Sequence, residues 1–177
     1  MVKVIVGMMG SSGGGGSSSM ASTPPVQEFL ECMRSHGIKE LDTARVYAGW
    51  KSEELLGQVQ AHKQFAISTK APAFSPKSLA EEKIIANCNA SLKALGQKKV
   101  DICECLIFIT LAATTPNPAR RSTRPRPETP LEEQCRAIEK LYSEGKFSKF
   151  GISNLSPAEV QKIHDICKQE KYPLPSI

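Results

Sequence analysis

The feature that most constrains the fold is a regular alternation of short apolar runs with amphipathic helical patterns along the chain. Segments suited to strands begin near residues 2, 39, 65, 100 and 147, and each is followed by a helix-like segment. This alternation is typical of strand and helix units around a parallel sheet. A chain of 177 residues, 40% of them apolar, can bury one core of this kind.

The number of units indicates which parallel fold to expect. Strands are predicted at 2–7, 39–42, 65–69, 100–106 and 147–153, and a sixth strand begins at 175–177. Five strand and helix units followed by the start of a sixth strand correspond to part of a (β/α)8 barrel. The predicted fold class is therefore α/β, a partial TIM barrel.

Three helix starts carry a sequence pattern for capping. The pair Ser78 and Glu81, the run Thr129-Pro130-Leu131-Glu132 and the run Ser156-Pro157-Ala158-Glu159 each place a carboxylate three residues after a hydroxyl. In a capping box these side chains satisfy backbone N–H groups that the first helical turn leaves unpaired. Apolar stripes predict which side chains then face the sheet: Ile85, Cys88, Leu92 and Leu95, followed by Cys135, Ile138, Leu141 and Tyr142.

The six cysteines are interpreted as reduced core side chains. They stand at 32, 88, 103, 105, 135 and 167, without a CxxC pair, and no histidine has metal-ligand spacing, so no metal site is predicted. No run of eighteen apolar residues and no secretory signal is present. We therefore expect a cytoplasmic protein without a membrane partner.

Two stretches depart from the alternation. Residues 10–22 are dominated by Gly and Ser and lack the spacing of a phosphate-binding loop, so we interpret them as a flexible loop. Residues 107–127 are dense in Thr, Pro and Arg and are interpreted as a low-complexity insertion. Four arginines fall within 120–126, but no aromatics are interleaved with them. We therefore predict no nucleic-acid partner.

Three polar residues stand at or just after the ends of neighbouring predicted strands. Asp42 closes the second strand, Tyr47 follows five residues later, and Lys70 closes the third. The carboxyl ends of barrel strands form the face on which barrel enzymes gather functional residues. Each residue alone would be interpreted as a surface or ion-pair residue, but together they predict a catalytic site.

The motifs around these residues indicate a family. They are Leu-Asp-Thr-Ala at 41–44 before Tyr47, Ser-Thr-Lys at 68–70, and Gly-Ile-Ser-Asn at 151–154. Together they resemble the aldo-keto reductases. Gly145-Lys146-Phe147 and Ile166-Cys167-Lys168 are similar to the aflatoxin-aldehyde (succinic semialdehyde) reductase branch. The resemblance spans residues 1–177 outside the two irregular stretches, and implies one partial NADP-dependent oxidoreductase domain.

The resemblance implies NADPH-dependent reduction of small aldehydes or ketones. Tyr47 would be the general acid, and Lys70 would lower the pKa of its phenol, because a nearby positive charge favours the phenolate. Asp42 would pair with Lys70 and contact the cofactor ribose. Ser153 and Asn154 match the pair that binds the nicotinamide amide; without the resemblance, a turn residue and a loop residue explain them equally well.

The chain departs from the family pattern at two places. The family has a histidine at the end of the fourth strand, where this chain has Leu106. Loss of one preorganised donor to a developing oxyanion lowers the rate by about a hundredfold to a thousandfold. The family's last strands and its adenosine-phosphate loop would follow residue 177. We therefore expect this chain to be inactive by itself.

The alternative hypothesis is a non-catalytic half-barrel that binds a partner or a second copy of itself. An open parallel sheet presents unpaired backbone groups along its first and sixth strands. Pairing through these edges would give a homo-oligomer. Leu106 favours this alternative, whereas the set of Asp42, Tyr47 and Lys70 favours the reductase.

Overall fold

The computed structural model describes residues 3–9, 22–71, 77–107, 129–153 and 155–176. Asn154 lies outside these ranges, as do the two irregular stretches apart from residues 22 and 107. The interpretation of those stretches as a flexible loop and an insertion therefore stays a prediction.

Six parallel strands form one sheet in the order of the chain. They are β1 (Val6–Gly7), β2 (Glu40–Asp42), β3 (Ala66–Lys70), β4 (Val100–Ile107), β5 (Phe147–Ser153) and β6 (Pro175–Ser176). Each strand pairs in parallel with the next one along the chain. This sequential parallel order is the arrangement of a (β/α)8 barrel. The predicted partial barrel, with five units and the start of a sixth strand, is confirmed.

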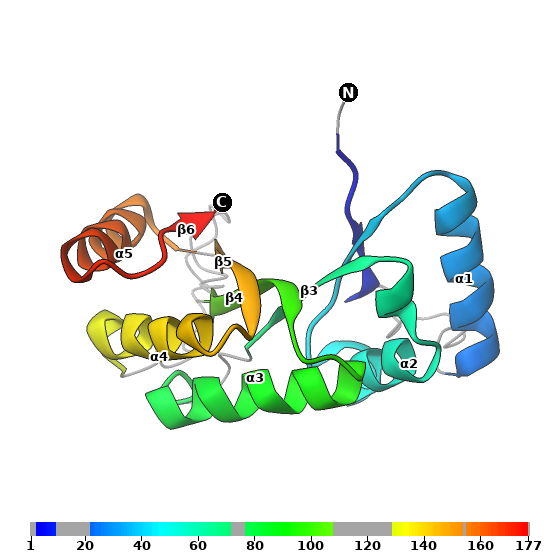
Figure 1. The fold of residues 1–177 in the computed structure, drawn as a ribbon, viewed down its shortest axis with the longest axis horizontal. Helices are drawn as coiled ribbons and strands as arrows, with labels where there is room; N and C mark the ends of the chain where they lie inside the picture. Colours follow the sequence, from blue (N-terminus) through cyan, green and yellow to red (C-terminus); the bar gives the residue numbers. More distant parts are fainter. Residues whose placement is uncertain (1–2, 10–21, 72–76, 108–128, 154, 177) are drawn as a thin grey trace, which may run out of the picture.

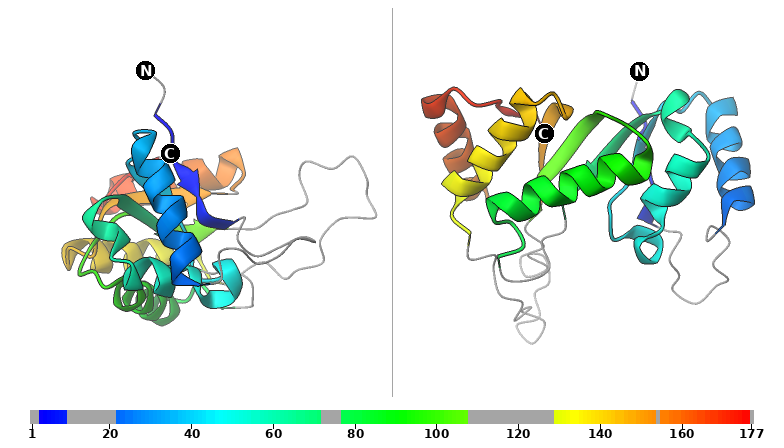
Figure 2. Two further views of the ribbon diagram at one scale, coloured as in Figure 1. Left: turned by 90° about the vertical axis from the view of Figure 1, so that its right-hand side faces the viewer. Right: turned by 60° about the horizontal axis from the view of Figure 1, so that its bottom comes forward.

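Within the described part of the chain, five α-helices cover one side of this sheet. They are α1 (Thr23–Ser35), α2 (Ser52–Gln58), α3 (Glu81–Leu95), α4 (Leu131–Ser143) and α5 (Pro157–Glu170). In Figure 1 the strands form an arc with the helices along its outer side, and Figure 2 shows the helices following one another in chain order. Two short 3-10 helices, η2 (Tyr47–Trp50) and η3 (Ala61–Lys63), flank α2.

The core lies between the sheet and the helices. Its largest fully buried side chains include Leu41, Ile67, Phe147 and Phe150 from the strands and Leu56, Ile84, Leu95, Ile138, Leu141 and Ile163 from the helices. Full burial of one such side chain stabilises the fold by about 1.5–3 kcal/mol. Because side chains alternate along a strand, the burial of Leu41 and Ile67 toward the helices turns Asp42 to the opposite, inner face of the sheet.

One of the three predicted capping boxes is present, at the start of α5. The Ser156 hydroxyl accepts the N–H of Glu159 at 3.3 Å, and the Glu159 carboxylate accepts the N–H of Ser156 at 2.8 Å. Pro157 fills the first helical position, where the missing N–H has no cost. The prediction for this helix is confirmed.

The other two capping predictions are wrong. α3 begins at Glu81 after Ala80, and the N–H of Glu81 donates to the carboxylate of Glu133 on α4 at 3.0 Å. A contact between two helices therefore replaces the local cap that Ser78 was predicted to supply. α4 begins after an extended Pro130, and no side-chain cap bond forms there in the described structure.

The predicted inward stripes are mostly correct, with Tyr142 and Ile85 as exceptions. Ile85 was predicted to face the sheet but is only partly buried. Its neighbour Ile84 is fully buried instead. Tyr142 is 44% exposed, because Ile138 and Leu141 already fill the inner side of α4. The helical spacing of the predicted stripes was thus correct, and the errors are confined to Ile85 and Tyr142, at the margins of the buried faces.

The cysteines whose side chains the structure describes, at 32, 88, 135 and 167, are free thiols. Cys88, Cys135 and Cys167 are buried, but Cys32 is exposed, because α1 turns Val26 and Leu30 inward instead. The core prediction for Cys32 was wrong. A hydrogen bond with the Cys167 thiol, together with burial, raises the pKa of Cys135 above its ordinary range, so Cys135 stays protonated.

α2 and α3 approach closely at Gly57. A Cβ atom at this position would lie 2.0 Å from the carbonyl oxygen of Ala94 on α3. Only glycine therefore allows α2 to lie at this depth against α3.

No helix in the described residues has the length and apolar character needed to cross a bilayer. Within the same residues, no group of three or more His, Cys, Asp or Glu side chains is arranged to hold a metal ion.

Candidate active site

Asp42 and Lys70 meet at the carboxyl ends of β2 and β3. Asp42 is in register with Ser68, so Lys70, two residues further along β3, projects from the same face. The Lys70 ammonium donates to Oδ1 of Asp42 and lies 3.4 Å from the carbonyl oxygen of Thr43. The two side chains are 13% and 27% exposed. This ion pair is therefore largely shielded but still reachable from the inner face.

Tyr47 lies beside this ion pair. It begins η2, and its N–H donates to the carbonyl of Ala44 at 3.0 Å. The Lys70 Nζ atom is 5.9 Å from the centroid of the Tyr47 ring, within the range of a cation–π contact. The structure therefore brings together the three predicted catalytic residues, and their catalytic roles stay a prediction.

The turn that follows Tyr47 is strained. Ala48, Gly49 and Trp50 have φ angles of 52°, 61° and 73° in succession. A non-glycine residue in this region costs about 1–3 kcal/mol, and such conformations persist only where the surroundings enforce them. α2 starts two residues after Trp50, so this turn leads directly into that helix.

A buried polar cluster lies on the other face of the same strand ends. Thr43 and Thr69 stand at alternate positions to Asp42 and Lys70, and so turn toward α2. The hydroxyls of Thr43 and Ser52 are 2.8 Å apart. Thr69 donates its hydroxyl to Oε1 of Glu53 at 2.5 Å.

Arg45 supplies the positive charge for this cluster. Its Nη1 atom is 3.4 Å from Oε2 of Glu53, whose side chain is 0% exposed. Burial of a carboxylate is strongly unfavourable unless it is paired and hydrogen-bonded, and here it is both. This cluster was not predicted from the sequence. Its signal in the sequence is a threonine next to the last residue of each strand, Thr43 after Asp42 and Thr69 before Lys70.

Comparison with known proteins identifies the family. Residues 3–176 match the model of the aldo/keto reductase family. The chain belongs to this family. The predicted resemblance is thereby confirmed.

Two relatives show how much of the family's length the chain covers. The oxidoreductase sirO of Leptosphaeria maculans is 34% identical over 151 residues, covering 85% of this chain and 41% of that protein. Aflatoxin B1 aldehyde reductase member 2 of Rattus norvegicus is 32% identical over 162 residues, covering 89% of this chain and 38% of that protein. The chain therefore spans less than half the length of these two relatives.

A solved structure supports the fold. A crystal structure of a thermostable aldo-keto reductase with the inhibitor epalrestat matches with a TM-score of 0.70 and 22% identity. The match covers 96% of this chain and 55% of that chain. The chain thus has the fold of part of that barrel.

Two further predicted positions, Leu106 and Ser153, lie on β4 and β5. Leu106 is the penultimate residue of β4 and is in register with Ile152. Ser153 ends β5, so it lies at the same end of the sheet as Asp42 and Lys70. Asn154 is outside the described residues, and the binding role of Ser153 stays a prediction.

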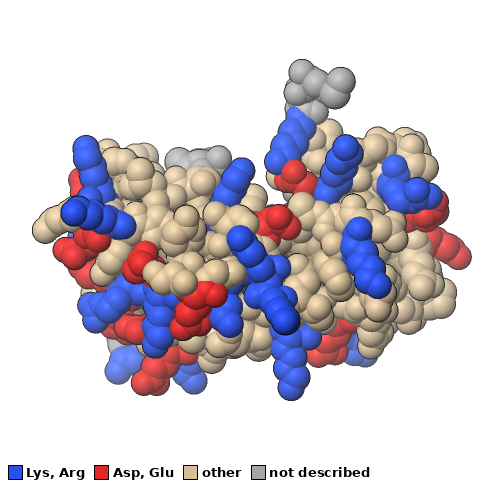
Figure 3. Space-filling model, viewed as in Figure 1, with Lys and Arg blue, Asp and Glu red and all other residues tan. Residues whose placement is uncertain are grey.

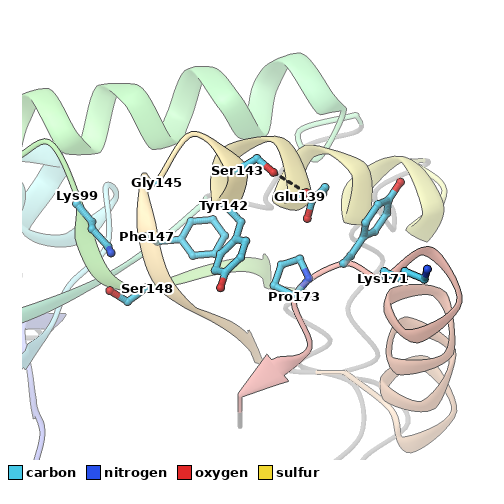
Figure 4. Close-up of a pocket in the computed structure, with 10 residues that line it drawn as sticks. Lys99, Glu139, Tyr142, Ser143, Gly145, Phe147, Ser148, Lys171 and Pro173 are labelled. Atoms are coloured by element: carbon cyan, nitrogen blue, oxygen red, sulfur yellow. Dashed lines mark hydrogen bonds between the residues drawn. The ribbon is translucent and has the colours of Figure 1, made fainter.

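A hollow of about 730 Å³ lies at the opposite, amino end of the strands (Figure 4). Its lining residues are Lys99, Glu139, Tyr142, Ser143, Gly145, Phe147, Ser148, Lys171, Tyr172 and Pro173. Here the Tyr142 and Phe147 rings pack with centroids 5.7 Å apart. In barrel enzymes conservation and packing at this face serve stability, while the chemistry lies at the carboxyl face.

The face shown in Figure 3 carries Lys and Arg side chains interspersed with Asp and Glu. Elsewhere in the described structure, Lys162 of α5 and Glu132 of α4 form an exposed ion pair at 3.0 Å. The arginines at 120–126 lie outside the described residues. This face therefore shows mixed charge typical of a solvated surface.

Proposed function

We propose that Asp42, Tyr47 and Lys70 form the proton-donating site of an NADPH-dependent carbonyl reductase. The observation that carries this proposal is the Lys70 ammonium, bound to Asp42 and 5.9 Å from the Tyr47 ring centroid. Family membership supports the oxidoreductase class and disfavours the non-catalytic half-barrel. The name of the rat relative supports an aldehyde as the substrate class.

Tyr47 is the proposed general acid for the carbonyl oxygen. A phenol with an ordinary pKa of about 10 is a weak acid near neutral pH. The nearby positive charge of Lys70 favours the phenolate that remains after proton transfer. Asp42 and the Thr43 carbonyl hold the Lys70 ammonium in place, because both accept a hydrogen bond from it.

The residues present fit a nicotinamide nucleotide. The partly exposed Asp42 carboxylate can accept a ribose hydroxyl while Oδ1 stays on Lys70. The hydroxyl of Ser153, at the same end of the sheet as Asp42, can donate to or accept from a carboxamide. The amide of Asn154, the next residue in the sequence, is the second proposed partner of that carboxamide. A bound nicotinamide cofactor supplies the hydride for carbonyl reduction.

Leu106 lowers the expected rate. An apolar side chain at the end of β4 cannot donate a hydrogen bond to the carbonyl oxygen. The loss of one such donor lowers the rate by about a hundredfold to a thousandfold. We therefore propose that the 177-residue chain has turnover close to background.

The test is NADPH oxidation with succinic semialdehyde by the chain and by the variant Leu106→His. We expect Leu106→His to raise the rate by about a hundredfold, and Tyr47→Phe in that variant to abolish the gain. NADPH binding is followed by the fluorescence of Trp50, the only tryptophan. If the Leu106→His variant binds NADPH without any gain in rate, or if Tyr47→Phe leaves the gain intact, the proposal is wrong.

The assembly and location are part of the same proposal. Among the described strands, β1 and β6 stand at the two ends of the sheet order and each pairs on one side only. We propose that the chain forms homo-oligomers through these edges, in a reducing cytoplasm that matches its described free thiols. Light scattering that gives a monodisperse species of 19.3 kDa would contradict the oligomer.

A further inference from the structure

We infer that Glu53 is a positioning residue that holds Lys70 and Tyr47 at the separation their chemistry needs. The inference rests on the proposed function of those two residues. Among the residues whose burial is described, Glu53 is the only acidic or basic one that is fully buried. A buried carboxylate is unfavourable without close partners, so its contacts indicate what it holds in place.

The first contact of Glu53 is with Thr69, the residue that precedes Lys70. Glu53 accepts the hydroxyl of Thr69 through Oε1 at 2.5 Å, and Thr69 directly precedes Lys70 on β3. Neighbouring residues on a strand project to opposite faces. By fixing Thr69 against α2, Glu53 fixes the direction in which Lys70 leaves the other face of the strand.

The second contact of Glu53 is with Arg45, in the loop that carries Tyr47. Glu53 pairs through Oε2 with Nη1 of Arg45 at 3.4 Å, and Arg45 stands two residues before Tyr47 in the loop after β2. Ser52, the neighbour of Glu53, holds Thr43 at the start of the same loop. One carboxylate therefore connects the strand end of Lys70 with the loop of Tyr47.

A positioning role and a purely structural role predict different results. A structural role predicts lower stability with an unchanged site in the molecules that stay folded. A positioning role predicts that Lys70 and Tyr47 separate, which raises the pKa of the Tyr47 phenol, because the cation favours the phenolate. The loss of the Glu53 charge alone acts in the opposite direction, since a negative charge disfavours a phenolate. The sign of the change therefore separates geometry from charge.

The experiment is an absorbance titration of tyrosinate in the full 177-residue chain. Each variant is compared with the same variant carrying Tyr47→Phe, which subtracts Tyr142 and Tyr172. We expect Glu53→Gln and Thr69→Val to raise the Tyr47 midpoint by about one pH unit. Thr69→Ser keeps the hydroxyl and should restore the original midpoint.

Two controls make the outcome decisive. Glu54→Gln removes an exposed carboxylate from the same helix and should leave the Tyr47 midpoint unchanged. Lys70→Met should raise the midpoint; if it does not, the proposed function fails independently of Glu53. If Lys70→Met raises the midpoint while folded Glu53→Gln and Thr69→Val leave it unchanged or lower it, the inference about Glu53 is wrong. Should Glu53→Gln fail to melt cooperatively, Thr69→Val and Thr69→Ser decide the matter.

Discussion

The two ends of the sheet hold polar side chains in different ways. At the carboxyl end of β2 and β3, Glu53 is fully buried and shares its oxygens between Thr69 and Arg45. At the amino end, Lys99 and Lys171 line an open hollow beside rings that pack against each other. Polar groups therefore organise one end of this part-barrel, and apolar packing organises the other. The difference suggests that substitutions of polar residues affect the two ends unequally.

The largest effect is expected from apolar packing at the amino end. Phe147 is 1% exposed and its ring packs against Tyr142. We expect Phe147→Ala to lower the free energy of unfolding by about 3–5 kcal/mol, because it leaves a cavity in the core. Chemical denaturation of the purified chain measures this. Tyr142→Ala, at a 44% exposed position, is the matched control and should have a clearly smaller effect.

The next effect tests the polar end. Arg45→Met leaves Glu53 buried with only the Thr69 hydroxyl among the contacts described here, and should destabilise the chain by about 2–4 kcal/mol. Lys99→Met removes a positive charge from the amino-end hollow and should change the stability by less than about 0.5 kcal/mol. Denaturation midpoints of the two variants compare the ends directly. Equal losses of stability in the two variants would contradict the proposed difference between the two ends of the sheet.

A smaller effect is expected at the helix starts. Ser156→Ala removes the cap of α5 and should lower the free energy of unfolding by about 1 kcal/mol. Ser78 makes no cap for α3, which begins after Ala80. Ser78→Ala should therefore give a thermal melting curve close to that of the unsubstituted chain, and a loss equal to that of Ser156→Ala would show that α3 is capped after all.

The smallest effect concerns pH. A backbone N–H of Glu132 itself, and then Lys162, hold the pKa of the Glu132 carboxyl below its ordinary value. A carboxyl with a lowered folded-state pKa adds stability above its unfolded pKa and loses it as the pH falls through the folded value. The pair is about half exposed, so the contribution should stay below about 0.5 kcal/mol. Melting curves of Glu132→Gln and the parent chain should differ at neutral pH and converge in acid.

The parts of the fold that were predictable depend on local periodicity. The alternation of strand-like and helix-like segments placed β2 to β5 within one or two residues of their observed bounds. The cap at Ser156 was also predictable, because its partner Glu159 is three residues away. At α3, by contrast, Glu133 of α4 replaced the local cap, and a partner 52 residues away leaves no local pattern.

The candidate site divides in the same way. Asp42, Tyr47 and Lys70 could be placed together because strand ends in a barrel converge and the motifs resemble one family. Glu53 was missed because a carboxylate in the first turn of a helix is ordinarily explained by the helix dipole and solvent. Its burial depends on how α2 lies on the strands, which is a property of tertiary packing.

That packing depends on Gly57. A methyl group there would collide with the Ala94 carbonyl, so α2 would have to move away from α3 and carry Ser52 and Glu53 with it. The size of residue 57 thus limits how accurately the site is assembled, although Gly57 makes no described contact with Tyr47 or Lys70. Residues on the exposed side of α2 can therefore vary widely, whereas one added carbon at Gly57 would shift the proposed acid, Tyr47, relative to the ammonium group of Lys70.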